Sequence, residues 1–491
     1  MTESLGPHYA ELITIAVFLA DLAIRVGLSV RVINRRRPVG VSLAWLTLVL
    51  LVPFAGAAVY LFVGENRLGR ERAVRAARVH APYVNWLKEL DARAVTNWFA
   101  MGPECEQHSR LCTSMAGIPP LPGNRLELIH TADETFRRLI ADIDAAQRSC
   151  HLEFYIWCVG GTADDVAEAL IRATKRGVSC RVLVDSVGSH EFLRSPLAQR
   201  MLDAGIKVQG ALPVGLVRML FVRIDLRLHR KIVVIDGEIG YTGSQNLVDP
   251  RFFKTDAGVG QWVDAMVRCE GPAVEPLGIT FLEDWELETG EGIEKLSKTA
   301  DVHAVPDRGS AAVQVVPSGP AQRGDAIYTI LLTTIYAARH ELVLTTPYFV
   351  PDESMLTALV AAAARGVRVT IVLPERVDSK LVRLASQAFK GDLLEAGVRI
   401  CMFRGGLLHT KSITVDGQFS LFGSLNLDPR SLWLNFEITL AVYEAEFTAV
   451  LRQLQEAYIR ESDLLTLEAW AARGIGQRFA DNAARLLGPL L

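Results

Sequence analysis

The sequence predicts an α/β protein with two tandem domains of like fold, packed with pseudo-two-fold symmetry and preceded by an N-terminal hydrophobic membrane hairpin. Three observations predict this. The motif His-x-Lys-x4-Asp-x6-Gly-Ser-x-Asn occurs twice, helix and strand patterns alternate before each copy, and two apolar segments lie near the N-terminus. The expected domains are residues 1–66 (membrane anchor), 67–118 (helical linker), 119–300 (first domain) and 301–491 (second domain).

The apolar segments are Leu12–Leu28 and Val39–Gly64, and both approach or exceed the length that crosses a hydrocarbon core of about 30 Å. The second is the stronger prediction of a span. In the first, Asp21 and Arg25 lie four residues apart, so they can pair on one helix face. An interfacial helix is the alternative for the first segment.

Arginines cluster on both sides of the second segment, at positions 31–37 and 67–78. Both clusters favour the cytoplasmic side of a membrane. A hairpin that enters and returns, with its second helix broken at Pro53 and Gly56, satisfies both clusters. The rest of the chain is then expected on the cytoplasmic face.

Composition bears on whether the protein binds nucleic acid, forms disulfide bonds or binds a metal. The chain has 491 residues and a net charge of −3, and this balance favours no nucleic-acid partner. Its seven cysteines are scattered and include no C-x-x-C pair, which favours free thiols in a reducing compartment. Cys105, His108 and Cys112 offer only three ligands, so we expect no metal site there.

Each domain shows the same order of elements. Strand and helix patterns alternate over Leu126–Trp157 and Ala163–Asp185, and again over Val313–Val350 and Glu353–Pro374. Apolar strands that alternate with helices predict largely parallel pairing. Because a period near 180 residues is too long for a solenoid, the repeat indicates a duplicated domain whose halves face each other.

The two motif copies differ in position by 180 residues throughout (409 − 229 = 180). Their corresponding residues are His229 and His409, Lys231 and Lys411, Asp236 and Asp416, Ser244 and Ser424, and Asn246 and Asn426. On a strand the His and Lys point to the same side, whereas the Asp points to the other and is expected to hold a turn. The Ser and Asn side chains are expected to bind phosphate, with backbone N–H groups of the turn.

Two such copies together suit a phosphate diester. Lysines oppose the charge that builds on phosphorus, and one imidazole can attack while the other protonates the leaving alcohol. Nucleophile and acid must stand on opposite sides of phosphorus, which explains two copies. These groups fill every charge-stabilising role, so no metal and no cofactor are expected.

Two carboxylates follow the motifs on matching predicted strands. Asp264 lies in QWVDAMV and Glu437 in NFEITLAV, where each can accept the second ring N–H of a histidine. We expect the longer Glu437 to hold His409. That pairing favours His409 as the acid and His229 as the nucleophile. The arginine-rich segment before the first motif, which should collect the donor headgroup, favours the same assignment.

Two further stretches combine apolar and basic residues. Val214–Arg230 leads into the first motif, with arginines that can meet lipid phosphates. Near the C-terminus, Ile475, Phe479 and Ala483 start one apolar helix face. Core packing is the alternative for both stretches.

These residues resemble the phospholipase D superfamily, whose His-Lys-Asp (HKD) motifs match both copies. The chain is most similar to bacterial cardiolipin synthases, through YLFVGEN, LEFYIW, TTPYFVPDE and LNLDPRSLWLNFE. After Trp157 the family tends to place an acidic residue, where this chain has Cys158, Val159 and Gly160. That departure concerns local substrate contacts, not the chemistry.

The resemblance implies an enzyme of the bacterial cell (inner) membrane. It transfers a phosphatidyl group from one phosphatidylglycerol to another, gives cardiolipin and glycerol, and passes through a phosphohistidine without metal or nucleotide. A phospholipase D hydrolase or a phosphatidylserine synthase would use the same histidine pair and is the alternative. A nuclease of the same superfamily would be expected to have a basic groove and no membrane anchor, which this sequence does not favour. An inactive membrane scaffold would be expected to have lost a motif residue, and none is missing.

Overall fold

The computed structural model describes residues 6–35, 39–64, 70–94, 97–213, 223, 225–320, 322 and 325–487. It contains an N-terminal unit that ends at Arg70 and a catalytic unit made of Glu71–Pro213 and Leu226–Gly488. Each unit is described by itself.

The N-terminal unit contains one described helix that is long and apolar enough to cross a membrane, within α1 (Gly6–Asn34). The second apolar segment forms α2 (Val39–Leu51) and α3 (Ala55–Val63), of 13 and 9 residues. The prediction that this segment is the stronger span is therefore wrong, since a spanning helix needs about 20 residues. The predicted break at Pro53 is confirmed.

Polar contacts hold this break. Asp21 and Arg25 form the predicted ion pair, at 2.6 Å. Asp21 also accepts the backbone N–H of Phe54 at 3.3 Å, and Arg25 donates to the carbonyl of Leu50 at 2.5 Å. A side chain at Gly56 would collide with the carbonyl of Leu48, so glycine allows α3 to approach α2.

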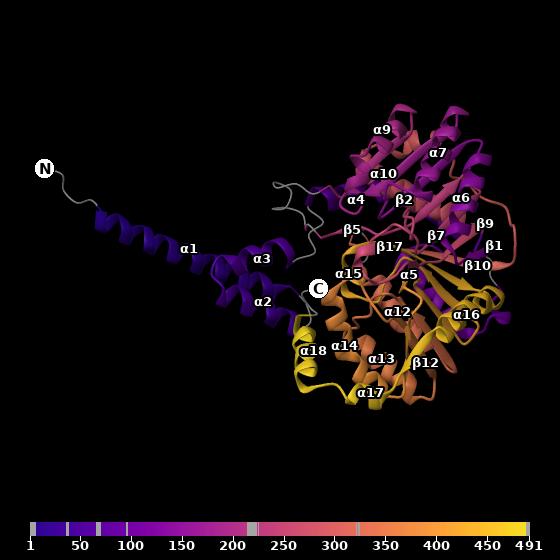
Figure 1. Cartoon of the computed structure of the whole chain (residues 1–491). Coiled ribbons are helices and arrows are strands. Elements are labelled where there is room, and N and C mark those ends of the chain that lie inside the picture. Colours follow the sequence, from indigo (N-terminus) through magenta and orange to yellow (C-terminus); the bar gives the residue numbers. More distant parts are fainter. Residues whose placement is uncertain are drawn as a thin grey trace. The chain divides into compact units, whose positions relative to one another are not determined.

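One mixed sheet organises the catalytic unit (Figure 1). Its order is β18-β13-β12-β11-β15-β16-β17-β10-β1-β9-β7-β6-β2-β3-β4. The first-half strands are β1 (Leu121–Ile129), β2 (Ser149–Phe154), β3 (Ser179–Asp185), β4 (Lys207–Ala211), β6 (Ile232–Ile235), β7 (Ile239–Gly243) and β9 (Met266–Glu270). The second-half strands are β10 (Ala311–Ser318), β11 (Glu341–Thr345), β12 (Arg368–Pro374), β13 (Arg399–Phe403), β15 (Ser412–Val415), β16 (Phe419–Gly423), β17 (Asn435–Tyr443) and β18 (Ser462–Leu465). Counted outward from the β1–β10 junction, the halves repeat the same order, and β18 is extra.

The expectation of largely parallel pairing is wrong. Among the described strands, parallel ladders within the halves join only β2, β3 and β4, and β11, β12 and β13. The motif strands β6 and β15 instead sit in antiparallel hairpins with β7 and β16. Apolar composition reports burial on both faces of a strand, which an inner antiparallel strand of a covered sheet also has.

Helices cover both faces of the sheet. In the first half, His151 of β2 stacks on Phe281 of α10 (Val274–Thr289), whereas the next residue, Leu152, packs among residues of α6 (Ala132–Ala145) and α7 (Thr162–Lys175). In the second half, α12 (Ala326–Ala337), α13 (Glu353–Ala364), α14 (Lys380–Glu395) and α16 (Ala445–Arg460) contact the strands.

Two helices of the predicted linker pack on this unit. On α4 (Arg70–Asp91), Trp86 donates to Glu275 of α10 at 2.6 Å. On α5 (Pro103–Ala116), His108 is buried, with its ring nitrogens 2.9 Å from the hydroxyls of Tyr443 and Thr334. His108 is thus a core residue with both nitrogens engaged.

Of the two stretches that combine apolar and basic residues, the structure describes the C-terminal one more fully than Val214–Arg230. Residues 214–222 and 224 lie outside the described residues. The C-terminal helix α18 (Ile475–Leu487) packs on α14. Its Ile475 and Phe479 are 85% and 75% exposed, which excludes core packing for these two residues.

Candidate active site

The two histidines follow short strands that cross between the halves. In the first half, β5 (Arg227–Leu228) pairs with β17 of the second half, and the N–H of His229 donates to the carbonyl of Phe436 at 2.9 Å. In the second half, β14 (Leu407–Leu408) pairs with β8 (Trp262–Val263) of the first, and the N–H of His409 donates to Val263 at 2.8 Å. The backbone therefore fixes each histidine against the opposite half.

The carboxylates are exchanged in the same way. Nδ1 of His229 donates to Glu437 at 2.8 Å, and Nδ1 of His409 donates to Asp264 at 2.6 Å. The expected pairing of Glu437 with His409 is therefore wrong. Because these side chains lie 208 and 145 residues apart, the order of residues along the chain could not show which carboxylate meets which ring.

The motif serines bind the carboxylates. Ser244 donates to Asp264 at 2.6 Å, and Ser424 donates to Glu437 at 2.5 Å. Each serine oxygen also accepts a backbone N–H, from Ala265 and Ile438 respectively, at 3.0 Å. The two hydroxyls thus orient the groups that orient the histidines, which differs from the expected phosphate contact.

The motif asparagines lie beside them, and both are buried. Asn246 accepts the N–H of Ile156 with its Oδ1 at 3.2 Å, while its Nδ2 has no hydrogen-bond partner within the described structure. Asn426 donates through Nδ2 to Ser431 at 3.1 Å. A buried donor without a partner is costly, so Nδ2 of Asn246 is suited to a ligand oxygen.

The two lysines are buried near the centre. Nζ of Lys231 donates to the carbonyl of His229 at 2.6 Å, and Nζ of Lys411 donates to that of His409 at 2.5 Å. Burial lowers the pKa of Lys231 to about 8 and that of Lys411 well below its ordinary value, while Asp264 and Glu437 oppose both shifts. The two carboxylates therefore favour the charged form of both lysines, against the effect of burial.

Burial also lowers the pKa of His229 and of His409 to about 4, against the opposing effect of their carboxylate partners. Both rings are then neutral at pH 7. Each neutral ring keeps its proton on Nδ1, where the carboxylate accepts it, and leaves the lone pair of Nε2 free to react.

Asp236 and Asp416 perform the turn-holding role that strand alternation predicts. Asp236 accepts the backbone N–H groups of residues 147, 148 and 149 at 2.7–2.9 Å, and Asp416 accepts those of residues 339, 340 and 341 at 2.7–2.8 Å. Both adopt a positive φ of about 50°. Their carboxylates hold strand ends and leave phosphorus to the other motif residues.

A buried charge network behind His229 was not predicted. Arg230 donates to the carbonyls of Glu437 and Ser318 at 3.0 and 3.2 Å and forms an ion pair with Asp284. Burial raises the pKa of neighbouring Glu153 well above its ordinary value. The sequence signal was the arginine between His229 and Lys231, where the second motif has Thr410.

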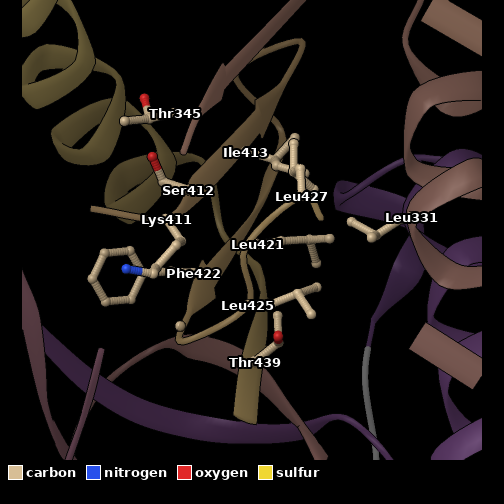
Figure 2. A pocket seen from close by; sticks show the side chains of 11 residues that line it. Leu331, Thr345, Lys411, Ser412, Ile413, Leu421, Phe422, Leu425, Leu427 and Thr439 are labelled. Atoms are coloured by element: carbon tan, nitrogen blue, oxygen red, sulfur yellow. The ribbon is translucent and has the colours of Figure 1, made fainter. Parts of the chain in front are cut away.

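A small cavity lies beside strand β15 (Figure 2), where Lys411 and apolar side chains of β15, β16 and α12 line it. Its volume of about 20 Å³ suits one water molecule, not a lipid headgroup. Within the described residues, no group of three or more His, Cys, Asp or Glu is arranged to hold a metal ion.

Two family models match the chain. A family model described as cardiolipin synthase, phospholipase D-like domain, matches residues 139–267 and 331–458. A phospholipase D-nuclease N-terminal model matches residues 23–65. The chain is 46% identical to cardiolipin synthase A of Erwinia tasmaniensis and of Yersinia pseudotuberculosis, over 95% of this chain and 96% of each relative.

Among solved structures, the phosphatidylserine synthase of Haemophilus influenzae matches with a TM-score of 0.57 and 13% identity. The match covers 79% of this chain and all of that one, and it supports the fold alone. The duplicated α/β unit with its two HKD copies defines an enzyme of the phospholipase D superfamily. Within that superfamily, the chain belongs to the cardiolipin synthase family. Its substrates are accordingly phospholipids.

Proposed function

We propose that the enzyme transfers a phosphatidyl group from one phosphatidylglycerol to the glycerol of another, through a phosphohistidine. The observation that carries this proposal is the pair of buried histidines from opposite halves, each held through Nδ1 by a carboxylate of the other half. Such a pair offers two reactive Nε2 atoms, one for attack and one for proton transfer.

In the first step, Nε2 of one histidine attacks phosphorus and forms a P–N bond. The P–O bond to glycerol breaks, and the second histidine, as imidazolium, gives its proton to the departing oxygen. In the second step, that histidine removes the proton from a glycerol hydroxyl of the acceptor. The acceptor oxygen attacks phosphorus, the P–N bond breaks, and cardiolipin forms.

The protonated acid needs support, because burial lowers the pKa of both histidines to about 4. A phosphodiester brings a negative charge next to both rings, and such a charge raises the pKa of an imidazole. Lys231 and Lys411 oppose the charge that develops on the phosphoryl oxygens, and Nδ2 of Asn246 can donate to one of them.

His229 remains our proposed nucleophile and His409 the acid. One of the two sequence arguments for this choice no longer holds, since Glu437 holds His229. The other argument, an arginine-rich stretch before His229 that collects the donor headgroup, still supports it. Arg227, two residues before His229, belongs to that stretch.

Intact-protein mass spectrometry tests the assignment. With a phosphatidyl donor that carries a nitrophenol leaving group, which departs without an acid, His409→Asn should accumulate an adduct on His229. His229→Asn should give no adduct with any donor. An adduct on residue 409 in the His229→Asn protein would reverse the roles.

A product assay separates the alternatives. Purified enzyme with phosphatidylglycerol should give cardiolipin and glycerol, whether or not serine is present. Phosphatidic acid as the main product would indicate a hydrolase, and a serine-dependent phospholipid would indicate a phosphatidylserine synthase.

We also propose that residues 1–66 form a hairpin in the bacterial cell membrane, with the catalytic domains on the cytoplasmic face. Helix α1 supports an anchor, and the broken α2–α3 segment suits a return. Protease treatment of right-side-out vesicles should leave the catalytic domains intact, and their digestion would place them on the outer face.

A further inference from the structure

The two histidines lie in similar settings, but their surroundings differ. Each ring packs on an aromatic side chain: His229 lies 5.1 Å from Tyr155 and His409 lies 4.4 Å from Trp262, between ring centroids. Beyond these aromatic rings, the two flanks present different polar groups. A symmetric reaction centre therefore has two chemically different sides.

On the His409 flank, three polar side chains form a chain of contacts. Nζ of Lys254 lies 5.4 Å from the centroid of the Trp262 ring and 3.1 Å from Oδ2 of Asp378. The hydroxyl of Tyr348 donates to Oδ1 of Asp378 at 2.6 Å. Lys254 comes from the first half, and Tyr348 and Asp378 come from the second.

Asp378 is charged at neutral pH. Burial acts to raise its pKa, but the hydrogen bond from Tyr348 and the nearby ammonium of Lys254 outweigh this effect and lower the pKa. An ionised carboxylate oxygen accepts two hydrogen bonds, so each oxygen of Asp378 keeps one acceptor position beyond its present partner. The ammonium of Lys254 can donate three hydrogen bonds.

The His229 flank also contains a carboxylate, Asp185, but backbone N–H groups of residues 187, 188 and 228 donate to it at 2.8–3.0 Å, and its cations are guanidinium groups. Burial raises the pKa of the Tyr155 phenol and Asp185 adds to this shift, whereas Arg227, which hydrogen-bonds to Tyr155, and Arg430 oppose it. Guanidinium groups suit phosphate oxygens. A carboxylate, an ammonium and a phenol together offer both acceptors and donors, which suits a neutral polyol.

From this difference we infer that Tyr348, Asp378 and Lys254 form a binding site for the free hydroxyls of a glycerol headgroup, next to His409. The inference rests on the proposed function, in which His409 protonates the leaving glycerol. The same site would then hold the glycerol of the incoming acceptor, because leaving and entering alcohols occupy the same side of phosphorus. The site would select glycerol over alcohols without vicinal hydroxyls.

A purely structural role is the competing explanation. The loop that carries Lys254 also touches the second half where Arg376 donates to the carbonyl of Gly258 at 3.4 Å. In that case the ion pair between Lys254 and Asp378 only stabilises the contact between the two halves of the catalytic unit. Loss of such a contact would slow the reaction with every donor, whereas loss of a glycerol site would slow it only where glycerol leaves or enters.

The experiment compares Asp378→Asn and Lys254→Met with the parent enzyme, in full-length protein. Asp256→Asn, an exposed position in the loop of Lys254, is the matched control. Two donors are used, phosphatidylglycerol and a phosphatidyl ester of nitrophenol, which has no glycerol. The ratio of kcat/KM for the first donor to that for the second should fall roughly 10- to 100-fold, the range expected when a hydrogen bond to a charged group is lost.

A second measurement follows glycerol directly. In the reverse reaction of cardiolipin with glycerol, the KM for glycerol should rise by a similar factor in both variants and stay unchanged in Asp256→Asn. An unchanged ratio, or an equal loss with both donors, would overturn the inference. Absence of a histidine adduct in His409→Asn with the nitrophenol donor would instead overturn the proposed function.

Discussion

At the scale of residues, the exchange of carboxylates between the halves makes each histidine dependent on the opposite half. Glu437 holds His229 and Asp264 holds His409, and each carboxylate also accepts a serine hydroxyl. Neither half contains a complete pair of histidine and orienting carboxylate. The two halves must therefore close on each other before either histidine is oriented for reaction.

The exchange predicts opposite effects for two conservative variants. Glu437→Gln should slow adduct formation with the nitrophenol donor, because it misorients the attacking ring of His229. Asp264→Asn should leave that step nearly intact and slow turnover of phosphatidylglycerol by about 100-fold or more, because it weakens the acid. Rapid-quench measurements of adduct formation for both variants check this, and the reverse pattern would exchange the roles of the histidines.

The network around Arg230 gives a prediction about stability. Arg230→Met removes the partner of buried Asp284 and should lower the free energy of unfolding by about 3–5 kcal/mol. Because burial raises the pKa of Glu153, its carboxyl is neutral, and Glu153→Gln should cost less than about 1 kcal/mol. Urea unfolding in detergent measures both variants. Equal destabilisation by both would show that Glu153 carries a charge.

At the scale of elements, the motif strands β6 and β15 end at aspartates that accept three backbone N–H groups each. These bonds fix the turn that starts each hairpin and hold it against the strand before it. The motif aspartates therefore position the strand whose other end carries His and Lys. This is an indirect contribution to the site.

Variants of Asp236 should change the free energy of unfolding but not the formation of the His229 adduct. Asp236→Ala should lower the free energy of unfolding by about 2–4 kcal/mol, through loss of hydrogen bonds to a charged acceptor. Asp236→Asn should cost less, because asparagine tolerates a positive φ and still accepts one bond. The fraction of folded protein that forms the His229 adduct should stay near that of the parent. Folded protein without an adduct would give Asp236 a direct catalytic role.

At the scale of the whole molecule, both motifs and every strand of the large sheet belong to the catalytic unit, which begins at Glu71. We therefore propose that the anchor ends near residue 66 and that the halves meet near residue 300. Deleting residues 1–67 should weaken membrane retention and leave the two α/β halves folded. Membrane fractionation with circular dichroism checks this, and an aggregated, unfolded product would make the anchor part of the fold.

The charge balance of the site predicts independence from divalent metal. In the proposed mechanism Lys231 and Lys411 oppose the charge on the phosphoryl oxygens, so activity should persist in excess EDTA. The assay uses detergent-dispersed substrate, to keep metal effects on lipid packing out of the measurement. Loss of activity that magnesium or calcium restores would contradict the prediction.

The sequence by itself determined much of this protein. Two motif copies at a constant offset indicated a duplicated domain and a paired His–Lys centre, and residue alternation predicted Asp236 at a turn. His229 and Lys231, predicted on one strand face, instead lie between β5 and β6. These inferences depend on neighbours along the chain, where 3.6-residue and two-residue periods fix direction. The break at Pro53 and the Asp21–Arg25 pair are local in the same sense.

Only the tertiary structure decided how distant segments meet. It placed Glu437 on His229 and Asp264 on His409, turned the motif serines to the carboxylates, and set the motif strands in antiparallel hairpins. Two nearly identical motifs offer the same side chains to either partner, so no local pattern distinguishes a carboxylate of the same half from one of the opposite half. Closure of the two halves through β5–β17 and β8–β14 makes that choice, because those ladders fix which side chains come within hydrogen-bond distance.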